Sequence, residues 1–352
     1  MNHKILICYN DPISLYDNYT GKELSDNDEF TDLSEKGFAQ QIEFIKSELE
    51  KNFYDVKTLG FNRDIITVIN KIKELAPDVI VNFVESINGD AEFESHVTGL
   101  FELLGIRYTG NYGFCLGNCL NKTRTKQILS SLNINSPKFL TLALNDKIDE
   151  PDFLLKFPVI IKLAREDASI GISELSVVNN FSDLKKRINY LRKNYKQAVI
   201  IEEYIDGREI NVSILGNEIL PLSEIKFDGL PNELPKIITY EAKWSPNSIY
   251  YQNTVPQCPA IVSDKLKSKI EKLALDAFNA LGCRDYARVD IRVSKDDIPY
   301  VIEVNPNPDI SLDAGFVRSA QNAGISYSEL LKKLVEFALS RKVYDTTFTV
   351  EG

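Results

Sequence analysis

Residues 287–309 read ARVDIRVSKDDIPYVIEVNPNPD and predict a β-hairpin, because Val and Ile alternate with polar residues on both sides of the KDDI turn. In this hairpin Asp290 lies opposite Glu303, and Arg288 lies opposite Asn305. Two carboxylates that face each other across a sheet repel, so we expect the pair to need a bound cation. Two carboxylates and one amide offer oxygen ligands, which suit Mg²⁺ better than zinc. Mg²⁺ on such a site usually accompanies phosphates.

The predicted register depends on a four-residue loop at residues 295–298. An alternative interpretation is a solvated face, on which Asp290 and Glu303 pair with Arg288 and Arg292. The hairpin alone leaves both interpretations open.

The composition is that of an ordinary folded protein. The 352 residues are too many for one compact core and predict two or three subdomains. The net charge of −10 opposes non-specific attraction to nucleic acid or anionic lipid, so a bound nucleotide would need localised lysines and a metal. No apolar run approaches the roughly 20 residues of a membrane span, and the N-terminus lacks the apolar stretch of a signal peptide. We therefore expect a cytoplasmic protein.

The five cysteines stand at scattered positions and, with His3 and His96, form no CxxC pair and no zinc quartet. We expect them to be reduced residues that pack in the interior. They are Cys8, Cys115, Cys119, Cys258 and Cys283.

The pattern of elements predicts a mixed architecture. The first third alternates short strands with helices, which is typical of a parallel α/β sheet. A small α+β lobe follows, and strands then dominate except for a helix at residues 263–281. We expect an N-terminal α/β domain at residues 1–118, a small lobe at 119–197 and a C-terminal lobe at 198–352.

Lysines from several segments are placed to meet phosphates. Lys162 ends the apolar strand FPVIIK, Lys122 opens a helix, and Lys243 stands in a long loop, residues 241–259. A lysine at a strand end is most often solvated, so each signal is weak alone. Together with a carboxylate-bound metal, they are what binding of a nucleoside triphosphate requires. The segment AVIIEEYIDGRE adds the carboxylates Glu202, Glu203 and Glu209.

The order of these motifs resembles the ATP-grasp superfamily and, within it, the D-alanine–D-alanine ligases. The resemblance covers nearly the whole chain, from VNFVESINGD to EVNPNPDIS. It is strongest in IEEYIDGREINVSILGNEILPLSEI, in EAKW and in the hairpin. It implies an ATP-grasp fold, in which two α+β lobes grip ATP behind an N-terminal α/β domain.

The resemblance also implies roles for individual residues. Lys122 and Lys162 would hold the α- and β-phosphates, Lys243 would lie on the loop that closes over the γ-phosphate, and Arg288 would steady the transferred phosphoryl group. The adenine and ribose site would comprise Glu202, Glu203, the backbone around Tyr204 and Ile205, and Glu209. The Mg²⁺ ligands would be Asp290, Glu303 and Asn305. Two Mg²⁺ ions, with Mn²⁺ as a substitute, and a homodimer are further implications.

The departures from the family pattern concentrate where D-alanine would bind. The segment after the first strand, CYNDPISLYDNYTGKELSD, lacks a recognisable Gly-Gly-x-Ser. The family's His-Gly is replaced by VES, which puts Glu85 or Ser86 near the acyl phosphate. Asp309 replaces a Gly of the oxyanion site, and Ala314 replaces a Ser that receives the second D-alanine, although Ser311 stands close enough to substitute.

We therefore expect an ATP-dependent carboxylate–amine ligase that forms an amide through an acyl phosphate. Its substrates would be small carboxylates and amines of amino-acid type other than two D-alanines, with no nucleic acid or membrane as partner. Three alternatives stay open: D-alanine–D-alanine ligase itself, a non-catalytic ATP-binding regulatory protein, and a phosphotransferase that stops at the phosphorylated product.

Overall fold

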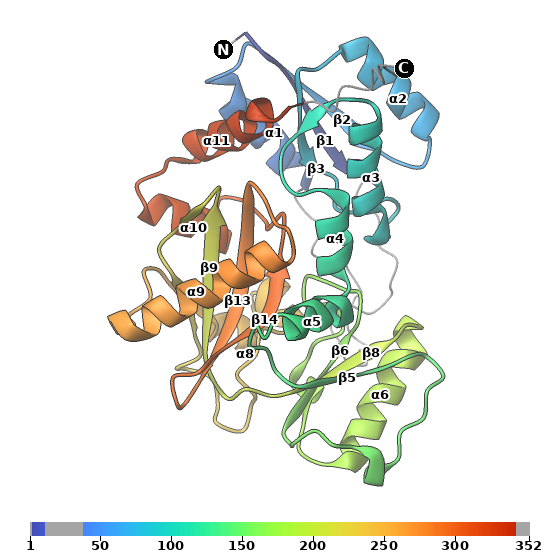
Figure 1. The fold of residues 1–352 in the computed structure, drawn as a ribbon, viewed down its shortest axis with the longest axis vertical. Coiled ribbons are helices and arrows are strands. Elements are labelled where there is room, and N and C mark those ends of the chain that lie inside the picture. The colour runs from blue at the N-terminus through green and yellow to red at the C-terminus, as the bar shows by residue number, and fades with distance from the viewer. Residues whose placement is uncertain (1, 11–37, 343–352) are drawn as a thin grey trace, which may run out of the picture.

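The computed structural model of the protein describes residues 2–10 and 38–342, and this part of the chain forms three β-sheets (Figure 1). The segment CYNDPISLYDNYTGKELSD spans residues 8–26, and its residues 11–26 lie outside the described residues. Each sheet carries its own helices, and the second and third sheets hold most of the predicted site.

The first sheet is parallel and has helices on both faces. Its elements are β1 (Lys4–Asn10), α1 (Phe38–Glu50), β2 (Asp55–Phe61), α2 (Ile65–Leu75), β3 (Val79–Phe83), α3 (Glu92–Leu103), β4 (Arg107–Tyr108) and, from the end of the chain, α11 (Tyr327–Ser340). The strand order is β2-β1-β3-β4. Successive residues of β1 point to opposite faces, so Ile5 and Ile7 pack with α1 and α11, whereas Leu6 and Cys8 pack with α2 and α3. The predicted parallel α/β sheet is confirmed.

The second sheet is small and antiparallel, in the order β5-β8-β6-β7. Its elements are β5 (Phe139–Leu142), β6 (Val159–Leu163), β7 (Val177–Val178), α6 (Phe181–Tyr195) and β8 (Val199–Glu203), with 3-10 turns at Glu150–Asp152 and Glu174–Ser176. Leu184, Ile188 and Leu191 of α6 are buried against it. Because β8 pairs with β5 and β6, the predicted boundary at residue 198 falls before a strand of this sheet, and the three-unit division stays a prediction.

The third sheet is the largest. Its elements are β9 (Gly207–Leu215), β10 (Glu218–Ile219), β11 (Ser223–Lys226), β12 (Val255–Gln257), α9 (Asp264–Ala280), β13 (Tyr286–Ser294), β14 (Pro299–Asn305) and α10 (Gly315–Asn322). The order is β12-β11-β9-β13-β14, with β10 beside β9. The predicted helix at 263–281 is α9, which covers one face with Leu266, Ile270 and Ala277.

Two further helices, α4 (Gly113–Leu120) and α5 (Lys122–Ser131), lead from the first sheet to the second, and two others, α7 (Tyr240–Trp244) and α8 (Ile249–Gln252), lie between β11 and β12 of the third sheet. The Asn121 side chain accepts a hydrogen bond from the Arg124 N–H at 3.1 Å, so Lys122 is the first residue of α5, as predicted. The long loop predicted at 241–259 contains most of α7, the whole of α8 and β12.

The hairpin formed by β13 and β14 has the predicted residue pairs at the site, but its loop is shorter than predicted and one strand contains a bulge. Arg288 pairs with Asn305, and Asp290 pairs with Glu303. The loop has three residues, 295–297, because Ser294 N–H donates to the Ile298 carbonyl at 2.9 Å and Asp297 adopts φ 55°. This shorter loop shifts the register by one residue, and a bulge beside Ile291 restores it before Asp290. The prediction of a four-residue loop was therefore wrong.

Gly110 joins the first sheet to the third, and we expect Gly110→Ala to destabilise the protein by about 1–3 kcal/mol. Its φ is +87°, and a Cβ there would lie 2.4 Å from Asn307 Oδ1. Gly99 of α3 is the matched control, since a Cβ there meets nothing within 4 Å. Gly99→Ala should stabilise the helix by at most about 1 kcal/mol. Urea unfolding measures both changes, and equal stability of the two variants would contradict this expectation.

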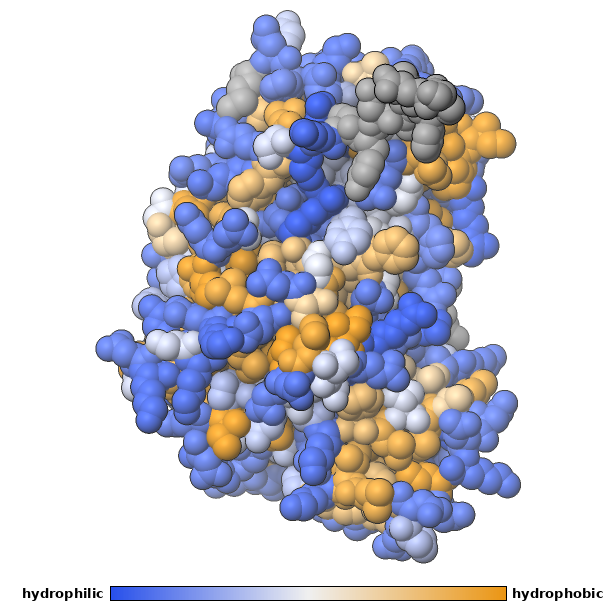
Figure 2. All heavy atoms as spheres, in the orientation of Figure 1, coloured by the Kyte–Doolittle hydropathy of each residue, from blue (hydrophilic) through white to orange (hydrophobic). Residues whose placement is uncertain are grey.

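The face of the molecule shown in Figure 2 is mainly hydrophilic, and its apolar side chains form separate patches. Among the described residues, no helix combines the length and the hydropathy that crossing a membrane requires.

Candidate active site

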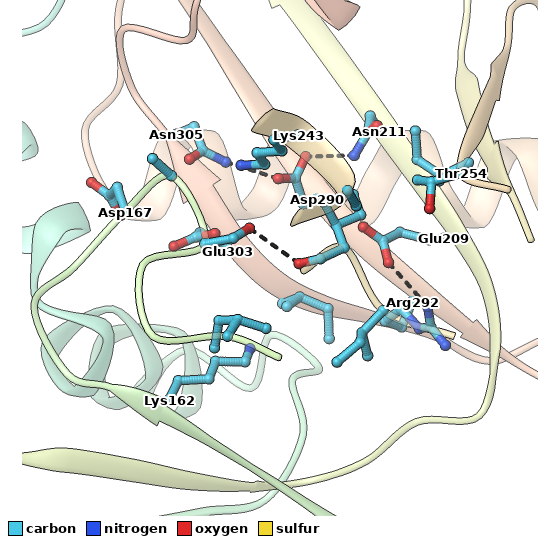
Figure 3. A pocket seen from close by; sticks show the side chains of 18 of the residues that line it. Lys162, Asp167, Glu209, Asn211, Lys243, Thr254, Asp290, Arg292, Glu303 and Asn305 are labelled. Carbon is cyan, nitrogen blue, oxygen red and sulfur yellow. Dashed lines mark hydrogen bonds and ion pairs between the residues drawn. The ribbon is translucent and has the colours of Figure 1, made fainter. Parts of the chain in front are cut away.

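A cavity of about 520 Å³ lies between the second and third sheets (Figure 3). It is lined by strands β6 and β8 from one side and by β9, β13 and β14 from the other. All the residues predicted for catalysis, ATP and metal line it: Lys122, Lys162, Glu202, Glu203, Tyr204, Ile205, Glu209, Lys243, Arg288, Asp290, Glu303 and Asn305. The fold thus gathers residues that are up to 183 positions apart (305 − 122) in one place.

The Asp290 carboxylate is bound by side chains from three strands. Arg288 donates to both of its oxygens, from Nε at 2.7 Å and from Nη2 at 2.9 Å. Asn211 Nδ2 of β9 and Asn305 Nδ2 of β14 donate at 2.7 Å and 2.9 Å. This network fixes the carboxylate against the floor of the cavity.

The Glu303 carboxylate is paired with Lys122. Lys122 Nζ lies 2.5 Å from Glu303 Oε1 and 3.1 Å from Asp167 Oδ1, and it also donates to the Glu166 carbonyl at 2.7 Å. Burial raises the pKa of Glu303, but the nearby Lys122 outweighs it and lowers that pKa to about 2. Burial likewise opposes the charge on Lys122, and Glu303 and Asp167 outweigh it and raise its pKa.

The expectation that the carboxylate pair lacks a balancing charge is therefore wrong. Arg288 balances Asp290 as the alternative interpretation proposed, and Lys122 from a distant helix balances Glu303. Arg292 pairs with Glu209 instead. The face is not solvated either, since the side chains of Asp290 and Glu303 are 13% and 26% exposed.

The donor chemistry of this face still fits Mg²⁺. Asp290 and Glu303 offer carboxylate oxygens, and Asn305 donates its amide N–H to Asp290, which leaves its amide oxygen for a cation. Figure 3 shows Asp290 and Glu303 between Lys162 and Lys243. An ion held here would compete with Lys122 for Glu303 and free its ammonium for a phosphate oxygen.

Lys162 and Glu202 form a buried cluster with a lysine that the sequence analysis missed. Glu202 Oε2 accepts from Lys162 Nζ at 3.0 Å, and Lys126 Nζ lies 3.5 Å from Glu202 Oε1. Burial lowers the pKa of Lys126 to about 8, although Glu202 acts in the opposite direction. The signal was its position four residues after Lys122, which puts both lysines on one face of α5.

The segment after β8 is held by Arg292. Arg292 donates to the Ile205 carbonyl at 3.1 Å and to Glu209 Oε2 at 3.0 Å, and its guanidinium lies 5.6 Å from the centre of the Tyr204 ring. Glu203 turns away, because its Oε1 accepts from the Lys156 N–H at 3.1 Å. The Glu203 carboxylate therefore binds the backbone at Lys156 and does not point into the predicted ATP site.

Two loops interlock beside the cavity. Tyr240 N–H donates to the Ile172 carbonyl, and Ser169 Oγ donates to the Ile238 carbonyl, both at 3.1 Å. They join the loop after Lys162 to the segment that carries Lys243. Ala168 and Ser169 have φ of 52° and 63°, and such strain in residues other than glycine is typical of functional loops.

A second cavity, of about 100 Å³, holds several of the weak substrate predictions. Glu85, Glu94 and Asp309 line it together with Asn82 and Tyr286. Burial, and then the nearby Glu85, raise the pKa of Glu94 well above its usual range. Asn82 Nδ2 is buried and has no hydrogen-bond partner among the described residues. Sequence reasoning missed Glu94 and Asn82.

The remaining residues of the weak predictions line neither cavity. Ser311 donates its N–H and its hydroxyl to Asp309, both at 2.7 Å, so these two residues form a local turn. Ser311, Ser86 and Ala314 are absent from the residues that line the two cavities. Ala314 is the N-cap residue of α10 and is buried.

Residues 128–336 match the family described as "D-ala D-ala ligase C-terminus". A protein of Sinorhizobium fredii, named uncharacterized protein y4sG, is 32% identical over 266 residues, which are 75% of each chain. The chain belongs to the D-alanine–D-alanine ligase family. It is therefore an ATP-grasp ligase, and the resemblance on which the sequence analysis relied is confirmed.

Named ligases match this family member over most of its length. The D-alanine–D-alanine ligase B of Clostridium perfringens is 28% identical over 302 residues, 86% of this chain and 93% of that protein. The D-alanine–D-alanine ligase of Bacillus anthracis, solved in complex with ATP, superposes with a TM-score of 0.72 at 25% identity and covers 96% of this chain and 97% of that chain. The predicted ATP-grasp fold is confirmed.

Proposed function

We propose that this ligase joins a carboxylate to an amine through an acyl phosphate, on substrates of amino-acid type other than two D-alanines. The observation that carries the proposal is the contrast between the cavities of about 520 Å³ and about 100 Å³. The large cavity gathers every residue predicted for ATP and metal, whereas the small one is lined by Glu85 and Asp309, two of the residues that depart from the family pattern.

The large cavity would bind ATP and its metal. Lys122, Lys162 and Lys243 would neutralise the phosphates, and Arg288 would steady the transferred phosphoryl group. Asp290, Glu303 and Asn305 would hold Mg²⁺, which when bound neutralises charge on the phosphate oxygens. Two ions, with Mn²⁺ as a substitute, are what the family resemblance implies.

The reaction would proceed in two steps. A substrate carboxylate oxygen attacks the γ-phosphorus and the bond to ADP breaks, so an acyl phosphate forms. The amine nitrogen then attacks the acyl carbon, phosphate leaves, and the amine loses its proton as the amide forms. The interlocked loops that carry Ser169 and Lys243 would shelter the acyl phosphate from water.

The small cavity suits a substrate with an ammonium group. Glu85, Glu94 and Asp309 bring three carboxyl groups to its lining. A bound ammonium would relieve the burial of Glu94 by favouring its ionised form, and Asn82 Nδ2 could donate to a substrate oxygen. Asp309 of this cavity lies close enough to Arg288 for charge interaction, and Glu94 lies close enough to Asp167. Because Arg288 and Asp167 line the large cavity, the small cavity adjoins the phosphate site.

The proposal includes a cytoplasmic location and a homodimeric assembly. A cytoplasmic enzyme has access to ATP and amino acids, and the net charge of −10 argues against nucleic acid as a partner. A homodimer is the assembly that the family resemblance implies.

The test is Mg²⁺-dependent phosphate release from ATP across pairs of D- and L-amino acids and simple carboxylates, with mass spectrometry of the products. We expect release coupled to a new amide for a pair other than two D-alanines. Coupled release with D-alanine alone would make the protein a D-alanine–D-alanine ligase. ATP binding without release for every pair would overturn the ligase assignment in favour of a regulatory role.

We expect Glu94→Gln to raise the KM for the ammonium-bearing substrate about ten-fold with little change in kcat, because a hydrogen bond to a charged group is lost. The raised pKa of Glu94 means that the carboxyl must ionise on binding, so the wild-type KM should fall as pH rises and the variant should lose this slope. Exposed Glu74 of α2 provides the control Glu74→Gln. An unchanged KM in Glu94→Gln would contradict the assignment.

A further inference from the structure

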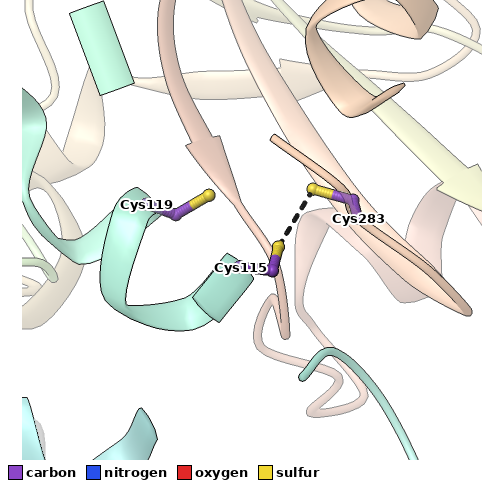
Figure 4. Close-up of side chains that lie close together, drawn as sticks. All are labelled: Cys115, Cys119 and Cys283. Carbon is purple, nitrogen blue, oxygen red and sulfur yellow. Dashed lines mark hydrogen bonds between the residues drawn. The ribbon is translucent and has the colours of Figure 1, made fainter. Parts of the chain in front are cut away.

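Three of the five cysteines converge at one point of the fold (Figure 4). Cys115 and Cys119 stand one turn apart on α4, and Cys283 lies between α9 and β13. One sulfur from each residue lies within 4.8 Å of the other two, and Cys115 Sγ is 3.5 Å from Cys283 Sγ. The sequence gives no sign of this cluster, because 164 positions (283 − 119) separate Cys283 from Cys119.

The cluster is separate from both cavities and has an apolar setting. Cys115 and Cys119 are buried with Leu129 and Phe278, while Cys283 is only partly buried as a residue. The three cysteines are absent from the residues that line the two cavities. The proposed ligase reaction therefore gives these thiols no task.

We propose that Cys115, Cys119 and Cys283 bind one soft metal ion of the class of Zn²⁺, Cd²⁺ and Cu⁺. Thiolate sulfurs are the preferred ligands of these ions. A metal–sulfur distance of about 2.3 Å places bound sulfurs about 3.8–4.0 Å apart. The Cys115–Cys283 separation of 3.5 Å is slightly below this spacing and the other two are at most 4.8 Å, so small side-chain rotations would complete the site.

A metal accounts for the cluster better than a disulfide. A disulfide between Cys115 and Cys283 would need the sulfurs to close from 3.5 Å to about 2.05 Å and would leave Cys119 without a role. A metal uses all three sulfurs.

Asn111 holds Cys115 beside the segment that leads into β13. The Asn111 side-chain oxygen accepts from Cys115 Sγ at 3.6 Å and from the Arg284 N–H at 2.6 Å. The ion would tie α4 to the segment that leads into β13, and it would stabilise this junction of the fold.

The first test is a titration of the whole protein with Cd²⁺ in the presence of excess Mg²⁺ and ATP. The thiolate-to-metal charge-transfer band reports sulfur ligands alone, so ions on the carboxylates stay silent. We expect one equivalent of Cd²⁺ to saturate the band in the wild type and in the control Cys258→Ser, and Cys119→Ala to lose it. The absence of a band in the wild type, or the same band in Cys119→Ala, would overturn the proposal.

The second test needs no substitution in the cluster. Native protein is alkylated with and without Zn²⁺, and the modified cysteines are counted by mass spectrometry. Zn²⁺ should slow modification of Cys283 by about ten-fold or more and leave Cys258 unchanged, because a metal-bound thiolate is a poor nucleophile. Equal modification of Cys283 in both samples would overturn the proposal, whereas ligase activity enters neither test.

Discussion

Glu303→Gln should lower Mg²⁺-dependent turnover by about 10²–10³-fold and leave the fold intact, an effect comparable to the loss of one preorganised transition-state contact. Gln keeps the size and one oxygen of the side chain but loses its charge. Two consequences combine. The face formed with Asp290 and Asn305 loses half of its carboxylate charge, and Lys122 loses the partner that lies 2.5 Å from its ammonium.

The Mg²⁺ dependence separates these two consequences. If Glu303 holds the ion, the Mg²⁺ concentration for half-maximal turnover rises in the variant. If it only positions Lys122, turnover falls while that concentration stays the same. Glu218→Gln makes the same change on the exposed strand β10 and should behave as wild type. Turnover in Glu303→Gln within two-fold of the wild type would remove Glu303 from the site.

Alternation along each strand predicted which side chains share a face. Val and Ile at every second position place Asp290 with Arg288 and Glu303 with Asn305, whereas the pairing between the two strands depends on the loop and on any bulge. The loop length was less predictable, since Asp297 adopts a left-handed conformation that favours a three-residue loop. The bulge then compensated for the shorter loop. The predicted pairs were correct, but the four-residue loop from which they were derived was not.

Contacts between distant segments were beyond sequence reasoning. Strand patterns cannot show that Lys122 reaches Glu303 across 181 positions, so the balance of charge was misjudged. The same limit hid the meeting of Cys283 with α4 and the packing of α11 against the first sheet. The family resemblance predicted residues that the fold brings to one cavity, because it carries the positions of residues in a known fold. It could not supply them for Glu94, which lines the cavity where the chain departs from the family.

Lys243→Ala should lower kcat by about 10²-fold and weaken ATP binding by no more than about three-fold. Lys243 stands on the short helix α7 and enters the cavity opposite Lys162 (Figure 3). It lies close enough to Arg288, Glu303 and Asp290 for charge interaction. In the proposed reaction a cation at this place would act on charge that develops during phosphoryl transfer, whereas ATP in the ground state would retain Lys122 and Lys162.

Two variants determine whether charge or loop closure explains the effect. Lys243→Arg keeps the charge and should recover at least part of kcat, while Ser169→Ala keeps Lys243 and removes the hydrogen bond to the Ile238 carbonyl. If closure dominates, Ser169→Ala should approach the loss seen in Lys243→Ala. Lys265→Ala on the exposed side of α9 is the control for removing a lysine. An equal loss of kcat and ATP affinity in Lys243→Ala would make this residue a ground-state binding lysine. The segment 237–244 would then line the nucleotide cavity without a separate role in phosphoryl transfer.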